Sequence, residues 1–182
     1  MQKFDTLEDN LKSICKIYKS HVTLGFTSNE IQSTDGDSFP LIMNKLIHQK
    51  LIRQYESKCI GHGYILPNSV KLLSRSAITF PPEALQLIYS VRVEFEYIIC
   101  NPNPDSIIEC SIVSRNKIGI LARMKEAKSP LVILIPYDLC ETQEKHTELI
   151  RNFRIKDTIR VKIVGKKFEQ NDKKIIVIAE II

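Results

Sequence analysis

Several features that mark membrane, secreted and metal-binding proteins are missing from this chain of 182 residues. It has no run of eighteen apolar residues, although a membrane-spanning helix needs about twenty. Its polar first ten residues lack the apolar segment of a secretion signal. We therefore expect a protein without a membrane span that stays inside the cell.

Cysteines are few and scattered. Their number is odd and no Cys-x-x-Cys pair occurs, so a zinc site or a disulfide framework is not supported. Cys100 and Cys110 lie in apolar contexts, where a cysteine usually behaves as a small hydrophobic residue. The five cysteines are Cys15, Cys59, Cys100, Cys110 and Cys140.

No catalytic constellation is apparent either. Gly61 and Gly63 lack the further glycine and the Lys-Ser/Thr of a phosphate loop, so they are better explained by tight turns or by close backbone approach. His48 has no second ligand at metal-binding spacing. Paired carboxylates and Ser/His/Asp sets are also absent at telling spacings. We expect no catalytic residue, metal or cofactor.

Positive charge is concentrated near the end of the chain. Residues 151–174 contain nine Lys or Arg and three Asp or Glu, and their excess is larger than the net charge of +5 of the whole chain. A lysine run is most often a solvated face and predicts nucleic-acid binding only weakly. Its position on a barrel hairpin would strengthen that prediction.

The same region has the period of a β-hairpin. Ile159, Val161 and Ile163 alternate with Arg160 and Lys162, as in a half-buried strand with a basic outer surface. Residues 175–182 form a second apolar strand after a lysine-containing loop. This pattern indicates a closing hairpin with a basic side.

Two domains are predicted, with a joint at residues 101–105, where two prolines, two asparagines and an aspartate favour turns. Residues 1–100 read as an α+β domain. We expect a helix over residues 6–18, a strand over 22–26, a loop over 28–37, a helix from 37 or 38 to 55 with Pro40 in its first turn, and strands at 64–66, 70–73 and 91–97.

Residues 106–182 read as an all-β domain. Strands are expected at residues 108–112, 118–124 and 131–135, followed by a helical excursion over 137–153 and the closing hairpin. Five strands with a helix between the third and the fourth describe an OB-fold barrel.

A family resemblance supports this two-domain prediction. The chain resembles the seventh subunit of RNA polymerase II and its counterpart in the archaeal polymerase, the E-prime protein, and is most similar to the form encoded by large nucleocytoplasmic DNA viruses. The resemblance runs from about residue 19 to the C-terminus, so the helix at 6–18 is an addition. It is carried by residues 55–69, 100–102, 108–110, 119–120, 129–133 and 164–172.

This resemblance implies a noncatalytic stalk subunit of a DNA-directed RNA polymerase. Its N-terminal tip domain would dock on the largest polymerase subunits near the clamp, and its OB domain would guide nascent single-stranded RNA during transcription. A second stalk subunit is a further implied partner. A viral gene would imply transcription in the virion and the host cytoplasm, and a cellular gene would imply the nucleus.

Two sets of residues are candidates for these contacts. Docking is expected on a turn-rich segment, although its apolar members can equally pack the small domain. The docking candidates are Gly61, Gly63, Tyr64, Ile65, Leu66 and Pro67. RNA contacts are expected from side chains that neutralise phosphates without reading sequence. These are Arg115, Lys117, Arg123, Lys125, Lys128, Arg160, Lys162, Lys166 and Lys167.

Aromatic side chains are scarce beside the RNA candidates. OB-fold platforms usually stack bases on rings, each worth about 1 to 3 kcal/mol, but Ile120 and Leu121 stand where a ring would be expected. RNA binding should therefore be weak and salt-sensitive. A free-standing OB-fold protein acting in translation or RNA turnover remains the alternative, but it leaves the upstream domain without a purpose. An enzyme is the least favoured class.

Overall fold

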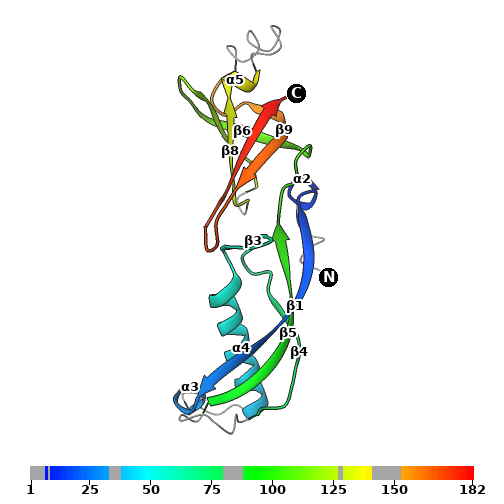
Figure 1. The fold of residues 1–182 in the computed structure, drawn as a ribbon, viewed down its shortest axis with the longest axis vertical. Helices are drawn as coiled ribbons and strands as arrows, with labels where there is room; N and C mark the ends of the chain where they lie inside the picture. The colour runs from blue at the N-terminus through cyan, green and yellow to red at the C-terminus, as the bar shows by residue number, and fades with distance from the viewer. Residues whose placement is uncertain (1–6, 8, 33–37, 80–87, 127–128, 141–152) are drawn as a thin grey trace. The chain divides into compact units, whose positions relative to one another are not determined.

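The computed structural model has an N-terminal region of helix and antiparallel sheet, followed by a closed five-stranded barrel of the OB type (Figure 1). It describes residues 7, 9–32, 38–79, 88–126, 129–140 and 153–182. The predicted fold class is confirmed. No helix in the described part of the chain is long and apolar enough to cross a membrane.

The chain forms two compact units. One contains residues 17–56 and 67–98, and the other contains residues 1–16, 57–66 and 99–182. We call them the helix unit and the barrel unit. The domain limits predicted from the sequence, with a joint at 101–105, remain a prediction.

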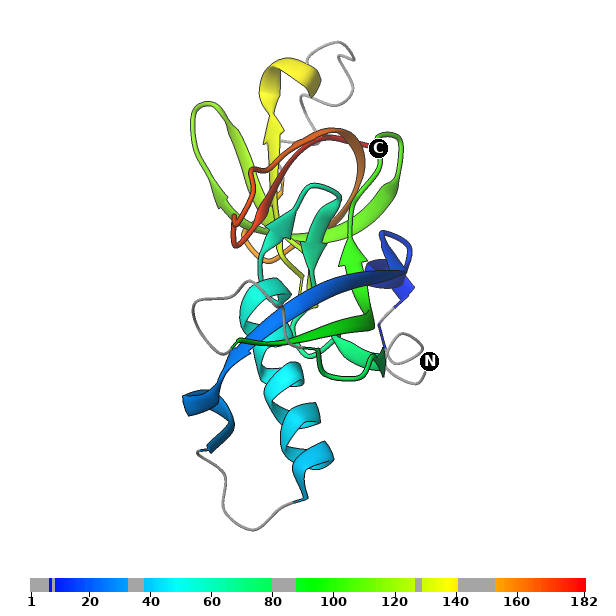
Figure 2. The same ribbon diagram turned by 60° about the horizontal axis from the view of Figure 1, so that its bottom comes forward.

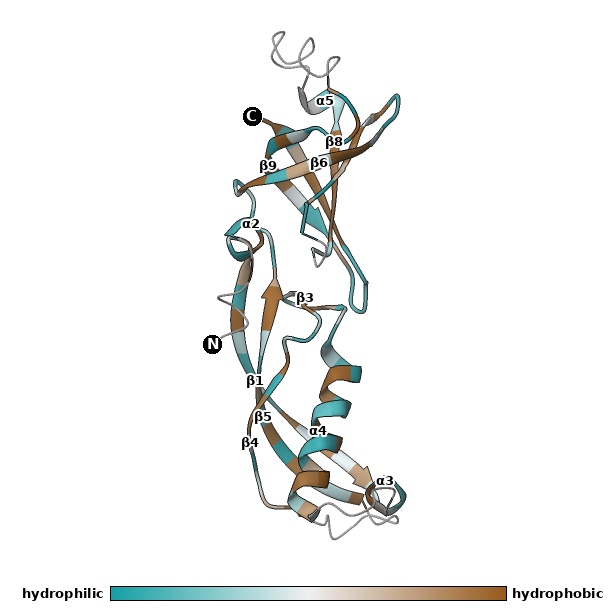
Figure 3. Cartoon of the chain, turned by 180° about the vertical axis from the view of Figure 1, so that it is seen from behind, coloured by the Kyte–Doolittle hydropathy of each residue, from teal (hydrophilic) through white to brown (hydrophobic). Residues whose placement is uncertain are grey.

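One long helix, α4 (Phe39–Tyr55), packs on the strands of the helix unit. Pro40 stands in its first turn, where a missing N–H costs nothing. Met43, Ile47 and Leu51 recur at helical spacing and are fully buried, so α4 shows alternating apolar and polar bands in Figure 3. The helix predicted from residue 37 or 38 to 55 is confirmed.

The antiparallel sheet is built around β5 (Ile88–Cys100), of which residues 88–98 belong to the helix unit. Its neighbours are β1 (Cys15–Thr27), β3 (Gly63–Ile65) and β4 (Lys71–Arg75), and β2 (Cys59–Ile60) pairs with β3. Val91, Val93 and Phe95 alternate on the covered face, and Figure 2 shows α4 against that face. The strands predicted at 22–26, 70–73 and 91–97 are confirmed within these elements.

Two predictions upstream of α4 were wrong. The helix expected over residues 6–18 is confirmed only as α2 (Asp9–Lys12), because the chain becomes β1 at Cys15 and pairs with β5. The loop expected over residues 28–37 contains a short helix, α3 (Ser28–Gln32). Glu30 accepts hydrogen bonds from the backbone and hydroxyl of Thr27, which is the capping-box signal that we missed.

The barrel closes in the order β10-β8-β7-β6-β9. Its strands are β6 (Ile107–Arg115), β7 (Gly119–Arg123), β8 (Leu131–Pro136), β9 (Thr158–Lys167) and β10 (Ile175–Ile181). The pair β8–β10 is parallel and the other pairs are antiparallel. All the predicted barrel strands are confirmed. The helical excursion begins as α5 (Tyr137–Cys140), and residues 141–152 lie outside the described part.

Alternate residues of all five strands fill the barrel. Ile133, Val161, Ile163 and Val177 have no exposed surface. Period-2 patterning therefore placed one face of each strand inward, as the sequence predicted.

Stability should fall in alkaline solution because burial raises the pKa of thiols in the barrel unit. Burial raises the pKa of Cys110 to about 12, and burial, with the charge of Asp172, raises the pKa of Cys59 to about 11. In the unfolded chain these thiols ionise near pH 9, so above that pH the unfolded state binds fewer protons than the folded state. The free energy of unfolding should therefore decrease from about pH 9 to about pH 12.

Urea denaturation at about pH 8 and about pH 10.5, on either side of the unfolded thiol pKa, tests this expectation. The variant Cys110→Ala should lose less of its stability between the two pH values than the unaltered protein. An equal loss in both proteins would show that the Cys110 thiol does not contribute.

Candidate nucleic-acid interface

The basic hairpin β9–β10 is attached to the rest of the barrel unit through its loop. The backbone N–H of Cys59 donates to the carbonyl of Asp172 at 2.7 Å, and the N–H of Asn171 donates back to the carbonyl of Cys59 at 2.9 Å. Asn171 has a positive φ of 71°, which asparagine tolerates well. The loop is therefore held against β2.

Lys166 and Lys167 are neighbours with different surroundings. The Lys166 ammonium donates to Asn101 Oδ1 and, at 2.9 Å, to the carbonyl of Pro102. Partial burial lowers the Lys166 pKa. Lys167 is exposed and lies opposite Ile176 on β10. Lys166 thus has an internal structural role, whereas the Lys167 charge faces solvent.

Carboxylates neutralise the other two basic residues of β9. Lys162 lies 2.9 Å from Asp105 and 3.7 Å from Glu180, and its pKa is raised mainly by the Asp105 hydrogen bond. Arg160 lies 3.8 Å from Glu109. Both cations would have to exchange these partners for phosphates, so they are weaker candidates than Lys167.

The remaining RNA candidates lie along β6 and β7. Arg115 donates to the carbonyl of Phe153 at 2.7 Å, and Lys117 is exposed in the turn that follows. Asn116 stabilises this turn by accepting hydrogen bonds from Ile118 and Gly119, both at 2.9 Å. Arg123 and Lys125 are exposed at the end of β7 and just beyond it. Lys128 lies outside the described residues.

The predicted RNA residues thus do not form one uniform patch. Four of the described candidates combine exposure with no carboxylate partner in the described part of the chain, namely Lys117, Arg123, Lys125 and Lys167. Their role in RNA binding remains a prediction.

Most of the docking candidates are buried within the barrel unit. Tyr64, Ile65 and Leu66 are buried, while Gly61 is exposed and Pro67 half-buried. Burial gives the three apolar residues a packing role, which was the alternative explanation for them. Docking by this segment remains a prediction.

The backbone conformation at position 63 explains why a glycine stands there. Its φ of +135° is strained for other residues, and an added Cβ would lie 2.6 Å from the Cys100 carbonyl oxygen. Tyr64 pairs with Cys100 directly beside this contact. The glycine is therefore required for close backbone approach, as its sequence context predicted.

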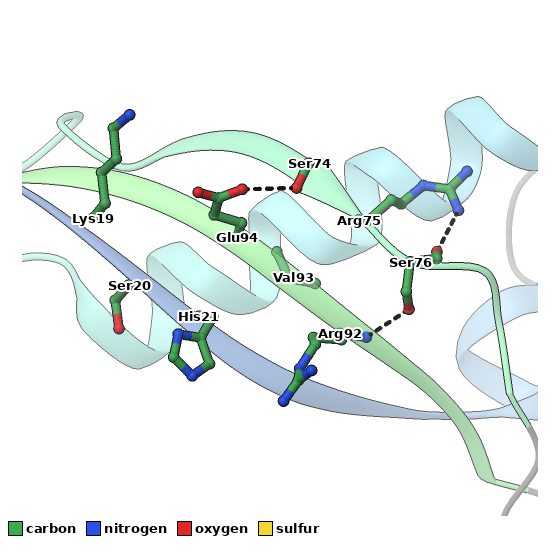
Figure 4. A pocket seen from close by; sticks show the side chains of 9 residues that line it. All are labelled: Lys19, Ser20, His21, Ser74, Arg75, Ser76, Arg92, Val93 and Glu94. Carbon is green, nitrogen blue, oxygen red and sulfur yellow. Dashed lines mark hydrogen bonds between the residues drawn. The ribbon is translucent and has the colours of Figure 1, made fainter.

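A second polar region, which we did not predict, lies on the open face of the sheet in the helix unit. It is a shallow groove of about 540 Å³ across β1, β5 and β4. Lys19, His21 and Arg92 project from β1 and β5 (Figure 4). The sequence could have predicted these outward side chains from the alternation in β1 and β5, because residues that flank buried positions of a strand face outward.

Serines and one carboxylate complete this groove. Ser74 donates to Glu94 at 3.0 Å, and Ser76 Oγ accepts a hydrogen bond from the Arg92 backbone at 3.0 Å (Figure 4). Arg75 is turned toward α4, where its Nε donates to Asn44 Oδ1 at 2.7 Å. The groove thus combines the cations Lys19 and Arg92 with hydroxyl groups and the Glu94 carboxylate.

No group of three or more metal-binding side chains occurs among the described residues. The chain matches no model of a known protein family and no curated protein sequence.

Proposed function

We propose that this protein is a noncatalytic stalk subunit of a multisubunit DNA-directed RNA polymerase. Its helix-bearing N-terminal region would attach to the polymerase core near the clamp. Its barrel would lie beside emerging RNA and guide it during transcription. The partners are the large polymerase subunits, nascent single-stranded RNA and, in some assemblies, a second stalk subunit.

The observation that carries this proposal is the order of the two folds. A helix packed on an antiparallel sheet comes first, and a closed barrel with parallel β8–β10 pairing follows. The family resemblance implies this order. A free-standing OB-fold protein would need only the barrel, so the N-terminal region supports the polymerase subunit.

The charge arrangement also supports a guiding role. Exposed Lys167, Arg123 and Lys125 can attract phosphates from solution. Among the described residues, the face between Lys167 and Arg123 carries the aliphatic side chains of Ile176, Ile178, Leu134 and Leu121 and no aromatic side chain for stacking. Weak contacts of this kind suit RNA that a larger complex delivers.

Affinity purification from the native source tests the assignment. The tagged full-length chain should recover the two largest polymerase subunits at low salt, and they should be identified by mass spectrometry. A tagged, unrelated OB-fold protein of similar charge serves as the control. Recovery of ribosomal or RNA-decay proteins, with no polymerase subunits, would favour the free-standing alternative and reject the proposal.

The two adjacent lysines give a sharper test of RNA contact. Lys167→Gln should weaken binding to single-stranded RNA to a similar extent for all sequences and should reduce the salt slope by about one. Lys16→Gln, an exposed lysine outside the predicted set, is the matched control. Fluorescence anisotropy across a salt series measures both quantities, and equal behaviour of the two variants would contradict the role of Lys167.

Lys166→Met should have the opposite profile. RNA affinity should change little, because the ammonium already bonds Asn101 and Pro102. Loss of those bonds should lower the Tm instead. A large loss of RNA affinity with an unchanged Tm would show that Lys166 faces the RNA.

A further inference from the structure

The outer face of strands β7, β8 and β10 is apolar, although it is open to solvent. Ile176 is 43% exposed, Ile178 41% and Leu134 38%. Scattered exposed aliphatic residues are common on proteins, but a contiguous set usually marks an interaction site. Contiguity therefore decides whether this face is a candidate binding surface.

Strand register places these side chains next to one another. Ile178 lies opposite Leu134, and Leu134 lies opposite Leu121, so one row of outward side chains crosses three strands. In the next row Ile176 lies opposite Val132. Val164, which is also exposed, lies beside this face where β9 bulges against β10. These six residues form what we call the aliphatic face.

Cations flank the aliphatic face on both sides. Lys167 on β9 lies directly opposite Ile176. On β7, Ala122 pairs with Ile133, so the next residue, Arg123, comes level with Val132. Arg123 therefore ends the row of Val132 and Ile176 at β7, as Lys167 ends it at β9. Neither Lys167 nor Arg123 has a carboxylate partner among the described residues. An occupant should therefore be apolar in the middle and acidic on both edges.

The width of the face selects the shape of that occupant. Neighbouring strands lie about 4.8 Å apart, so Arg123 and Lys167, three strand spacings apart along this row, are separated by about 14 Å. An α-helix with its side chains is about 10 to 12 Å across. A helix lying along β8 and β10 would cover the aliphatic rows and would bring its two edges to Lys167 and Arg123.

We propose that the aliphatic face binds an amphipathic helix of a partner protein, with an apolar stripe bordered on both sides by Asp or Glu. The strand 2–3 face of an OB barrel more often holds nucleic acid. Here the described residues of that face are aliphatic and include no ring, and base stacking on rings supplies much of the affinity for single strands. The chemistry of the face suits a helix better than RNA.

A designed peptide provides the probe. It would be about 18 residues long, roughly 27 Å as a helix, with leucines at i, i+3 and i+4 spacing and glutamates on both borders. Two controls have the same leucines with lysine borders, or the same composition in scrambled order. Binding of labelled peptide to the full-length protein should be about tenfold tighter for the glutamate peptide than for either control.

Variants then locate the binding surface. Ile178→Asp with Leu134→Asp should abolish binding, whereas Ile155→Asp, an exposed residue elsewhere on the barrel unit, should not. Lys167→Glu with Arg123→Glu should reverse the preference, so that the lysine-bordered peptide binds better. All substituted positions are exposed, and circular dichroism verifies that each variant is folded.

Three results would overturn the proposal. The first is equal binding of the glutamate and scrambled peptides. The second is concentration-dependent dimerisation that Ile178→Asp abolishes, since a second copy of the chain would then be the occupant. The third is single-stranded RNA that displaces the peptide and loses affinity with the uncharged change Ile178→Ser with Leu134→Ser, which leaves Lys167 and Arg123 unopposed and would make the face itself an RNA site.

Discussion

Gly119→Ala is expected to lower the free energy of unfolding by about 3 kcal/mol, near the upper end for overpacked cores. An added Cβ would press against the carbonyl oxygen of Ile135 and would lie 3.0 Å from Cα of Pro136. Both neighbours are backbone atoms of β8, which pairs with β7 through Gly119 and Pro136. Backbone cannot rotate away as a side chain can, so the two strands must separate.

The matched control is Gly165→Ala in β9. A Cβ at Gly165 would meet nothing within 4 Å, so its stability should change by less than about 0.5 kcal/mol. Urea denaturation followed by circular dichroism measures both variants, and hydrogen exchange should show faster opening of β7 and β8 in Gly119→Ala. Equal stabilities would mean that the β7–β8 pairing tolerates the extra methyl group.

Phe95→Ala should destabilise the protein by about 4 kcal/mol. Phe95 is fully buried in the helix unit. Its ring centre lies 5.0 Å from that of Tyr55 on α4 and 5.5 Å from that of Tyr97. Removing the ring loses the buried area, leaves a cavity and ends both aromatic contacts. The Tm of the transition that unfolds α4 should fall accordingly.

Two control variants separate these causes. Phe95→Leu keeps most of the volume and should cost less than half as much as Phe95→Ala. Leu73→Ala, at a partly exposed position of β4, should change stability little. Thermal denaturation of all three variants is the measurement. If Leu73→Ala were as damaging as Phe95→Ala, the core of the helix unit would not centre on Phe95.

Alternation and turn residues were sufficient to predict most of the fold. Ile159, Val161 and Ile163 alternate with basic residues and do face the barrel core. The helix α4 followed from Pro40 and a stripe of apolar residues at helical spacing. These signals are local, because burying one side of a strand or helix leaves the same period in any fold.

The prediction of the N-terminal helix failed because pairing with a distant strand competes with the local helix propensity. Ile14, Cys15 and Tyr18 fit a helical stripe, yet residues from Cys15 onward form β1. Pairing with β5 satisfies their backbone groups and outweighs a weak helix propensity. At residues 28–32 the cause was different, since the local capping signal of Thr27 and Glu30 was present and was not used.

The candidate site was less predictable than the fold. Alternation cannot tell which charge finds a partner, and Lys166 and Lys167 look equivalent in sequence. Asn101 and Pro102, distant in the chain, turn Lys166 inward. Asp105 and Glu180 neutralise Lys162 in the same way. The groove at Lys19 and Arg92 also arises from separate strands.

The sequence by itself determines three things, because each depends on neighbouring residues. They are the periods of the strands and helices, the basic end of the chain and the order of its two folds. Which cations remain exposed depends on contacts between residues far apart in the chain, and so does the row formed by Ile178, Leu134 and Leu121. Strand pairing creates that row, since register aligns side chains across strands. Only the closed barrel brings aliphatic residues of three strands together between two cations.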